Sequence, residues 1–298
     1  MHDCNEAKMT EFVNELLDVE QPDFVVFSGD NDQTFVAKFR LRAMQAVVEP
    51  VEARQIPYAM IFGNHDDENG FSRDALVEIA MSGPHSYTQR GPRDVAGVGN
   101  YEVEVFAPAN SQWGAHEACV FRLYFLDSHA YPDNQAFPFI SSVYDWIKPN
   151  QIEYYRRLSA SHINANNSVP AIMFFHIPLV EYAANAESRT SGEKLEGVAS
   201  SDVNTNLFSA LVEVGDVKAT FAGHDHVNEY CYLREGIQLC YGGGVGLGEA
   251  YGRRDFPRRA RTIEWSMDAN GQRTIISWKR HFGDLNSRHN VELLYEDA

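Results

Sequence analysis

The chain has 298 residues, of which 44% are hydrophobic and 22% charged, a composition typical of a globular protein and unlike that of a disordered chain. Its net charge of -17 repels nucleic acids, so we expect no nucleic-acid partner, and an anionic substrate would need a metal ion or a few arginines. No apolar run of roughly 18 residues is present, and the first residues are too charged to resemble a signal peptide, so we expect no membrane partner.

The first predicted elements are helices and buried strands. A helix over residues 5–19 places its apolar side chains on one stripe, and a second helix over residues 40–48 is expected to end before Pro50. Four apolar segments predict strands buried on both faces, as in a largely parallel sheet covered by helices. They are "DFVVFSGD", "IPYAMIFGNHDDE", "VPAIMFFHIPL" and "VKATFAGHDH"; a fifth run, "ACVFRLYFLDS", also predicts a strand.

Two antiparallel hairpins are predicted towards the end of the chain, in "EYCYLREGIQLCYGGG" and "RTIEWSMDANGQRTIISWKR". The Asn270-Gly271 pair in the second hairpin is a strong turn signal. No repeat or linker divides the chain, so we expect a single α/β domain over residues 1–298. The order of elements predicts a layered sandwich of two sheets with helices outside.

The four cysteines, Cys4, Cys119, Cys231 and Cys240, have no metal-binding spacing and are expected to be buried or free thiols. The exception is the last pair. If the first hairpin turns at Glu235-Gly236, Cys231 and Cys240 could face each other and form a disulfide, which would imply an oxidising compartment.

Polar residues follow four of the predicted strands. They are Asp30; Asn64, His65 and Asp66; His176; and His224 and His226. Taken singly, each has a simpler interpretation, such as a turn acid for Asp30 or a core histidine for His176. Because ligands gather at the carboxyl ends of parallel strands, however, the set predicts one site. Carboxylate, amide and imidazole ligands together suit Mn, Fe or Zn better than Ca or Mg.

These motifs resemble those of the calcineurin-like metallophosphoesterases, in the group similar to plant purple acid phosphatase-like and fungal cell-cycle phosphatases. The matching residues are "GD" at Gly29-Asp30, "GNHD" at Gly63 to Asp66, the strand-terminal His176, and "GHDH" at Gly223 to His226. The resemblance implies a four-layer α-β-β-α sandwich of two mixed sheets. It also implies hydrolysis of phosphoric esters, most readily monoesters, in a phosphorylated small molecule or a phosphoprotein.

The resemblance further implies a role for each residue at a centre of two divalent ions, either Mn, Fe or Zn. Asp30 would bridge the ions; Asn64, His176 and His224 would hold one ion, and His226 would belong to the other. His65 would hydrogen-bond the phosphate or protonate the leaving oxygen. Asp66 would orient or charge His65, although a simple turn acid is an equal alternative.

The chain departs from the family pattern in two places. Family members carry an Asp-x-His motif on a first strand, which this chain lacks, so the second metal site is expected to be incomplete. An N-terminally truncated chain is the explanation we favour; loss of one metal or a substitute ligand are the alternatives. Asp127-Ser128-His129 is a literal match, but we expect a loop there. Gln33 replaces the tyrosine of purple members, which favours a divalent pair over a ferric tyrosinate.

Several alternatives remain open at this point. The protein could be a phosphodiesterase, or an inactive or single-metal relative that acts as a binding protein. A basic cluster could bind phosphate or form a solvated loop; it consists of Arg253, Arg254, Arg258, Arg259 and Arg261. If a signal peptide precedes the given sequence, a secreted or vacuolar location is expected.

Overall fold

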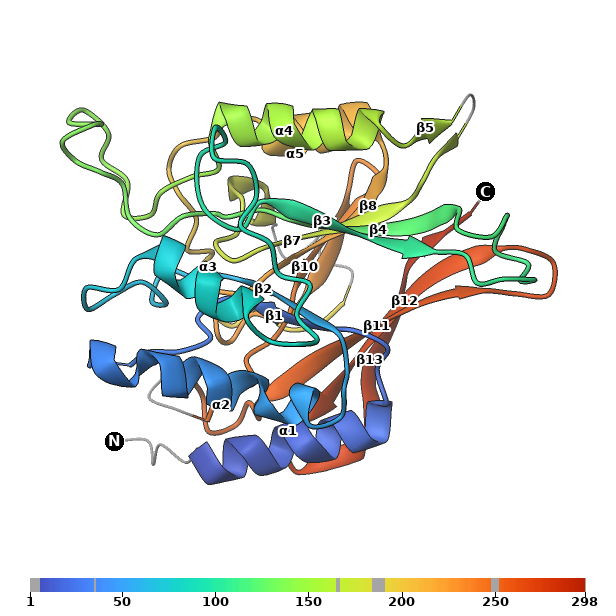
Figure 1. The fold of residues 1–298 in the computed structure, drawn as a ribbon, viewed down its shortest axis with the longest axis horizontal. Coiled ribbons are helices and arrows are strands. Elements are labelled where there is room, and N and C mark those ends of the chain that lie inside the picture. Colours follow the sequence, from blue (N-terminus) through green and yellow to red (C-terminus); the bar gives the residue numbers. More distant parts are fainter. Residues whose placement is uncertain (1–5, 35, 165–166, 184–190, 248–251, 298) are drawn as a thin grey trace.

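The helices and strands form four layers, with helices outside and strands inside (Figure 1). The computed structural model describes residues 6–34, 36–164, 167–183, 191–247 and 252–297. Its helices are α1 (Glu6–Glu20), α2 (Arg40–Glu52), α3 (Arg73–Met81), α4 (Pro149–Ala160) and α5 (Leu207–Val214), with short 3-10 turns η1 (Ala37–Phe39) and η2 (Val180–Tyr182). Its strands are β1 (Val25–Ser28), β2 (Tyr58–Ile61), β3 (Tyr101–Phe106), β4 (Cys119–Phe125), β5 (Ile163–Asn164), β6 (Asn167–Ser168), β7 (Ala171–Phe175), β8 (Val217–Ala222), β9 (Cys231–Arg234), β10 (Ile237–Tyr241), β11 (Arg259–Met267), β12 (Arg273–His281) and β13 (Asp284–Glu296).

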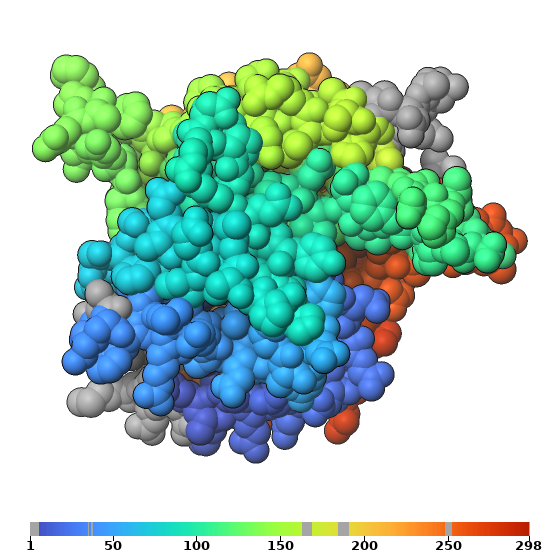
Figure 2. Space-filling view, viewed as in Figure 1, coloured from blue at the N-terminus to red at the C-terminus, as the bar shows by residue number. Residues whose placement is uncertain are grey.

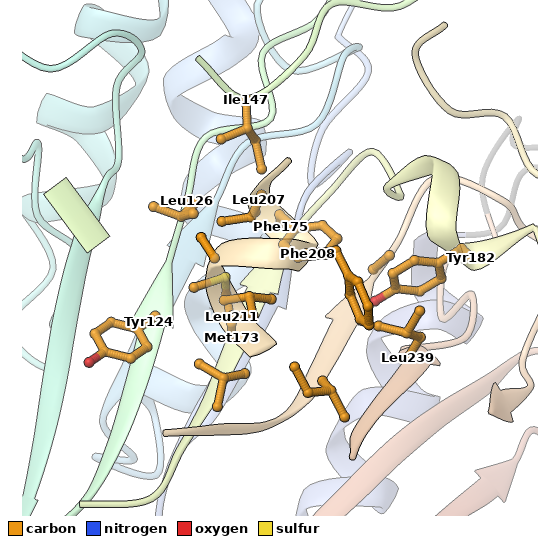
Figure 3. Close-up of a cluster of buried hydrophobic side chains, with 14 of the residues drawn as sticks. Tyr124, Leu126, Ile147, Met173, Phe175, Tyr182, Leu207, Phe208, Leu211 and Leu239 are labelled. Atoms are coloured by element: carbon orange, nitrogen blue, oxygen red, sulfur yellow. The ribbon is translucent and has the colours of Figure 1, made fainter. Parts of the chain in front are cut away.

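A six-stranded mixed sheet forms one inner layer, in the order β3-β4-β7-β8-β10-β9. Its four middle strands are parallel, and the two edge strands are antiparallel to their neighbours. All five residues of β7 are buried, as the continuous apolar pattern predicts. Helices α4 and α5 cover the outer face, and Figure 3 shows Met173 and Phe175 of β7 in the same apolar cluster as Leu211 of α5.

The second inner layer consists of two separate hydrogen-bonded units, where one mixed sheet was expected. Strands β1 and β2 form a parallel pair, and β11, β12 and β13 form an antiparallel sheet. Side chains from both units, including Ile61 and Ile275, pack against Phe174 of the six-stranded sheet. On the other side, α1, α2 and α3 cover β1 and β2 through a third apolar cluster that includes Leu17 and Met60. The four-layer sandwich is therefore confirmed.

The predicted elements are found with two differences. Strand β1 is only partly buried along its whole length, although its apolar pattern predicts burial on both faces. Helix α2 does not end before Pro50 but continues to Glu52. Pro50 removes one backbone donor near the end of the helix, and the burial of Val51 in the third cluster outweighs that loss. Among the described residues, no helix is long and apolar enough to cross a membrane.

Both predicted hairpins are present. Glu235 and Gly236 join β9 to β10 with positive φ angles of 47° and 83°, which is the backbone conformation of a tight two-residue turn. Their register places Cys231 directly opposite Cys240, and the two form a disulfide with a Cα–Cα distance of 4.1 Å. The second hairpin turns through Gly271, whose φ is 87°.

The segment between β4 and α4, around residues 130–145, projects from the body of the molecule (Figure 2). Phe139 within it is 99% exposed and Val143 is 69% exposed. The base of this segment lies over the carboxyl ends of the strands, where Tyr144 packs edge-on against His224.

The disulfide generates a stability prediction. Because it closes a loop in the unfolded chain, replacing Cys231 and Cys240 together by serine should lower the free energy of unfolding by about 2–3 kcal/mol. Urea denaturation measures this. A reductant should destabilise the wild-type protein by the same amount and leave the double variant unchanged. The Cys119→Ser variant serves as the control and should respond to reductant as the wild type does; equal sensitivity of the double variant would contradict the prediction.

Candidate metal centre

The ends of β1, β2, β7 and β8 bring the predicted ligands together. His176 directly follows β7, while Asp30 and His224 each lie two residues beyond β1 and β8. The strands approach closely at Gly29, where an added Cβ would lie 2.3 Å from His176 Nδ1. Only glycine fits there, and its φ of 93° independently favours glycine.

Asp30, His176 and His224 form the core of the site. One ligand atom from each lies within 4.8 Å of the others. His176 Nε2 is 3.1 Å from Asp30 Oδ2. Asp30 and His224 both have left-handed backbone conformations, with φ angles of 51° and 67°, that are unfavourable for residues with a Cβ. Local strain of this kind concentrates at functional sites, where the surrounding structure holds it in place.

Within the described part of the chain, three buried polar atoms of this centre form no hydrogen bond: Asn64 Oδ1, His176 Nε2 and His224 Nε2. His176 Nδ1 lies 2.9 Å from the Ser28 carbonyl and must donate to it. In the neutral ring, Nε2 therefore carries a lone pair that faces the Asp30 carboxylate, whereas in the protonated ring it donates to that carboxylate. Buried acceptors that face one another are unfavourable unless a cation lies between them. These residues therefore fit a bound metal ion.

The electrostatic setting keeps Asp30 and His224 in their metal-binding forms. Burial lowers the pKa of His176, but Asp30 raises it more, so without a cation in the site this ring takes up a proton beside Asp30. Burial raises the pKa of Asp30, but the neighbouring His176 more than offsets this, so the pKa lies below its usual value and the carboxylate is ionised. Burial, together with His176, lowers the pKa of His224 to about 3, so its imidazole is neutral. Ionised carboxylate and neutral imidazole are the forms that bind metal.

Of the two interpretations of Asp66, its contacts favour a loop acid over a residue that orients His65. Its buried carboxylate accepts hydrogen bonds from the backbone amides of Gly63 at 2.7 Å, Asn31 at 2.8 Å and Asp32 at 3.1 Å. It therefore ties the loop after β1 to the loop after β2, and it does not orient the His65 ring. Burial, and then the charge of Asp30, raises the pKa of Asp66.

His65 lies beside Glu68, which the sequence analysis missed. Its ring Nδ1 lies 3.0 Å from Glu68 Oε1, and its backbone amide donates to Asp30 Oδ1 at 3.0 Å. In the sequence, the one hint of this contact is that Glu68 follows His65 by three positions. The His65 side chain is 37% exposed, so a substrate can reach it. Its predicted catalytic role stays a prediction.

Two tyrosines from the projecting segment were also missed. Tyr131 Oη accepts a hydrogen bond from Asn64 Nδ2 at 3.1 Å and donates one to Glu68 Oε1 at 3.2 Å. This contact holds the Asn64 amide by its nitrogen and leaves Oδ1 without a hydrogen-bond partner among the described residues. Tyr144 stacks near Tyr131 and packs its ring against His224, with ring centroids 4.5 Å apart.

Asp127 belongs to the scaffold of the site. It lies in the loop after β4, as expected, and pairs with Arg73 at 2.5 Å. Arg73 in turn donates to the Gly63 carbonyl at 2.6 Å, which fixes the loop that carries Asn64. His2 and Asp3, at the start of the chain, lie outside the described residues.

The basic cluster divides between surface and interior. Arg253 pairs with Asp255 at an exposed position, whereas Arg259 and Arg261 are buried beside Glu229 and Glu292. The neighbouring glycines include Gly244, where an added Cβ would lie 3.5 Å from the carbonyl oxygen of the predicted ligand His226. His226 is half-buried and close enough to His224 to lower the pKa of His224.

Comparison with known proteins identifies the family. The family model described as "Calcineurin-like phosphoesterase" matches residues 1–228. The chain belongs to this family. The match confirms the resemblance seen in the ordered "GD", "GNHD" and "GHDH" motifs.

Several relatives of this calcineurin-like phosphoesterase carry phosphatase names. It is 35% identical over 298 residues to probable inactive purple acid phosphatase 29 of Arabidopsis thaliana, and this alignment covers 93% of this chain and 74% of the relative. It is 37% identical over 297 residues to phosphatase DCR2 of Saccharomyces cerevisiae, and this alignment covers 93% of this chain and 49% of that protein. The crystal structure of a dimetal phosphatase from Danio rerio shares the fold, with a TM-score of 0.62 and 16% identity over 97% of this chain and 88% of the other.

The contact of Tyr131 with Asn64 generates a prediction. Tyr131→Phe removes the hydroxyl that orients the amide, so the affinity of this phosphoesterase for Mn²⁺ should fall by about 10-fold. Isothermal titration of metal-stripped protein measures the affinity. Tyr144→Phe is the matched control, because it keeps the ring against His224, and it should bind Mn²⁺ as the wild type does. Equal affinities for all three proteins would show that Tyr131 does not position Asn64.

Proposed function

We propose that this protein hydrolyses phosphomonoesters with the help of two divalent metal ions, which are Mn, Fe or Zn. The observation that carries the proposal is the cluster of Asp30, His176 and His224, in which the buried Nε2 atoms of both histidines form no hydrogen bond within the described part of the chain. When bound, two such ions would neutralise the phosphate charge and activate a water molecule for in-line attack. Phosphoryl transfer depends mainly on such charge stabilisation and on positioning, which agrees with the lack of any nucleophile motif.

In this proposal the side chains divide between two ions. Asn64, His176 and His224 would hold one ion and His226 the second, with Asp30 between them. The acidic chain suits an ion-dependent site, because a net charge of -17 would otherwise repel a phosphate ester. The substrate would be a phosphorylated small molecule or a phosphoprotein.

His65 would act on the ester itself. Its backbone amide is fixed by Asp30 and its ring lies beside Glu68, so the imidazole is held beside the ligand cluster while it remains reachable from solvent. From this position it would hydrogen-bond the phosphate or protonate the leaving oxygen.

Steady-state kinetics with p-nitrophenyl phosphate tests the proposal. The metal-loaded protein should hydrolyse this monoester faster than bis(p-nitrophenyl) phosphate, and His65→Ala should lower kcat by about 100-fold or more. His116→Ala is the matched control, because His116 is an exposed histidine whose side chain is 61% accessible, and it should leave kcat unchanged.

Metal analysis of the same sample separates the competing functions. About two ions per chain with monoester turnover supports the proposal, as the two-ion mechanism requires. Faster turnover of the diester would replace it with a phosphodiesterase function. A single ion, or none, without turnover of either ester would overturn the proposal in favour of a binding protein, a role consistent with the inactive name of the Arabidopsis relative.

A further inference from the structure

A second group of metal-ligand side chains lies far from the candidate metal centre. Glu104 on β3, Cys119 at the start of β4 and His162 just after α4 each offer one ligand atom, and these atoms lie within 4.8 Å of one another. Strand β4 rises about 3.3 Å per residue, so Cys119 is roughly 20 Å from the opposite end of this strand, the end nearest the metal centre. In Figure 1 the segment leading into β5 passes above this end of β3 and β4.

A β-bulge brings Cys119 to the correct face of the sheet. On β3, Tyr101 and Val103 face the core between the two inner layers, so Glu102 and Glu104 face the opposite side. Strict alternation would place Cys119 with Phe121 on the inner side. The register between β3 and β4 shifts between Cys119 and Phe121, which leaves Val120 as one extra residue on β4. Such a bulge changes the direction of a side chain, and here it allows the thiol to meet Glu104.

The surroundings of His162 resemble those of a metal ligand. Its Nε2 lies 3.2 Å from Glu102 Oε1, and its Nδ1 lies 3.4 Å from Glu104 Oε1. A neutral imidazole has one N–H, so if Nε2 donates to Glu102, Nδ1 directs a lone pair towards Glu104. A cation between these acceptors removes the repulsion. Metal-binding histidines commonly donate their other ring nitrogen to a carboxylate in this way.

We propose that Glu104, Cys119 and His162 bind a zinc ion, with Glu102 orienting the His162 ring. Thiolate, imidazole and carboxylate form a ligand set typical of zinc, and three protein ligands leave one tetrahedral position for water. The side chains of Glu102 and His162 are each 16% exposed and that of Glu104 is 33% exposed, so an ion can enter. The thiol proton is released to solvent on binding.

The site would connect the edge of the six-stranded sheet to the end of α4. Glu102 and Glu104 belong to the edge strand β3, and His162 begins the segment that leads from α4 towards β5. Zinc binding to the folded protein alone would stabilise it by mass action. The rival explanation is a protonated His162 that pairs with both glutamates and leaves no place for a cation.

Cobalt substitution distinguishes these explanations. A thiolate ligand gives Co²⁺ a sulfur-to-metal charge-transfer absorption, and no cysteine among the described residues belongs to the candidate metal centre. The test uses metal-stripped protein with Cys4→Ser as background, because Cys4 lies outside the described residues. Cys231 and Cys240 are already joined in the disulfide. Titration with Co²⁺ should produce the sulfur band and saturate it at a single equivalent per site.

Variants define the outcome. Cys119→Ser and His162→Gln should each abolish the band, whereas His224→Ala, at the candidate metal centre, should leave it intact. Zinc should raise the midpoint of thermal unfolding more in the background protein than in Cys119→Ser. The absence of a sulfur band, or its persistence in Cys119→Ser, would overturn the zinc site. Because the readout is independent of ester turnover, such a failure would leave the proposed phosphatase function untouched.

Discussion

The hydrogen bond between His176 Nδ1 and the Ser28 carbonyl holds the candidate metal centre together. Ser28 ends β1 in one inner layer, and His176 follows β7 in the other, so this 2.9 Å contact joins the two sheets at the point where the ligands converge. It also fixes the tautomer of the histidine, which leaves Nε2 available to a metal ion beside Asp30. The contact requires the close approach that Gly29 permits, because any side chain at that position would occupy the space of the imidazole.

Much of the centre could be predicted from the sequence, because the signal for each ligand lies in the residues immediately before it. Each ligand follows directly on a continuous apolar strand, and the carboxyl ends of parallel strands meet. The burial of β7 and the turn at Glu235-Gly236 likewise depend on neighbouring residues and were predicted correctly. The order of the motifs along the chain then added the specificity that no single histidine provides.

The supporting contacts could not be predicted, because they join segments that are distant in the sequence. Tyr131 reaches Asn64 across 67 positions, from a projecting segment with no regular pattern. Asp66 was assigned to its sequence neighbour, but burial directs its carboxylate to backbone amides 34 and 35 positions away. The division of the second layer into two units depends on the register and twist of its strands. An apolar run in the sequence indicates neither of these. The bulge at Cys119 is invisible for the same reason.

The fate of the basic cluster strengthens the case for metal dependence. The five arginines are the one dense cluster of positive charge that the sequence offers for phosphate binding. Two of them, however, are buried and paired with carboxylates in the interior. Arg259, Arg261 and Lys279 surround Glu229 and Glu292, with Lys279 Nζ 3.2 Å and 3.3 Å from the two carboxylates. Buried charges of this kind are costly unless paired, so these cations cannot turn towards a ligand without leaving uncompensated carboxylates. In the proposed function, bound ions held around Asp30 would supply the positive charge that these two buried arginines do not offer to a phosphate ester.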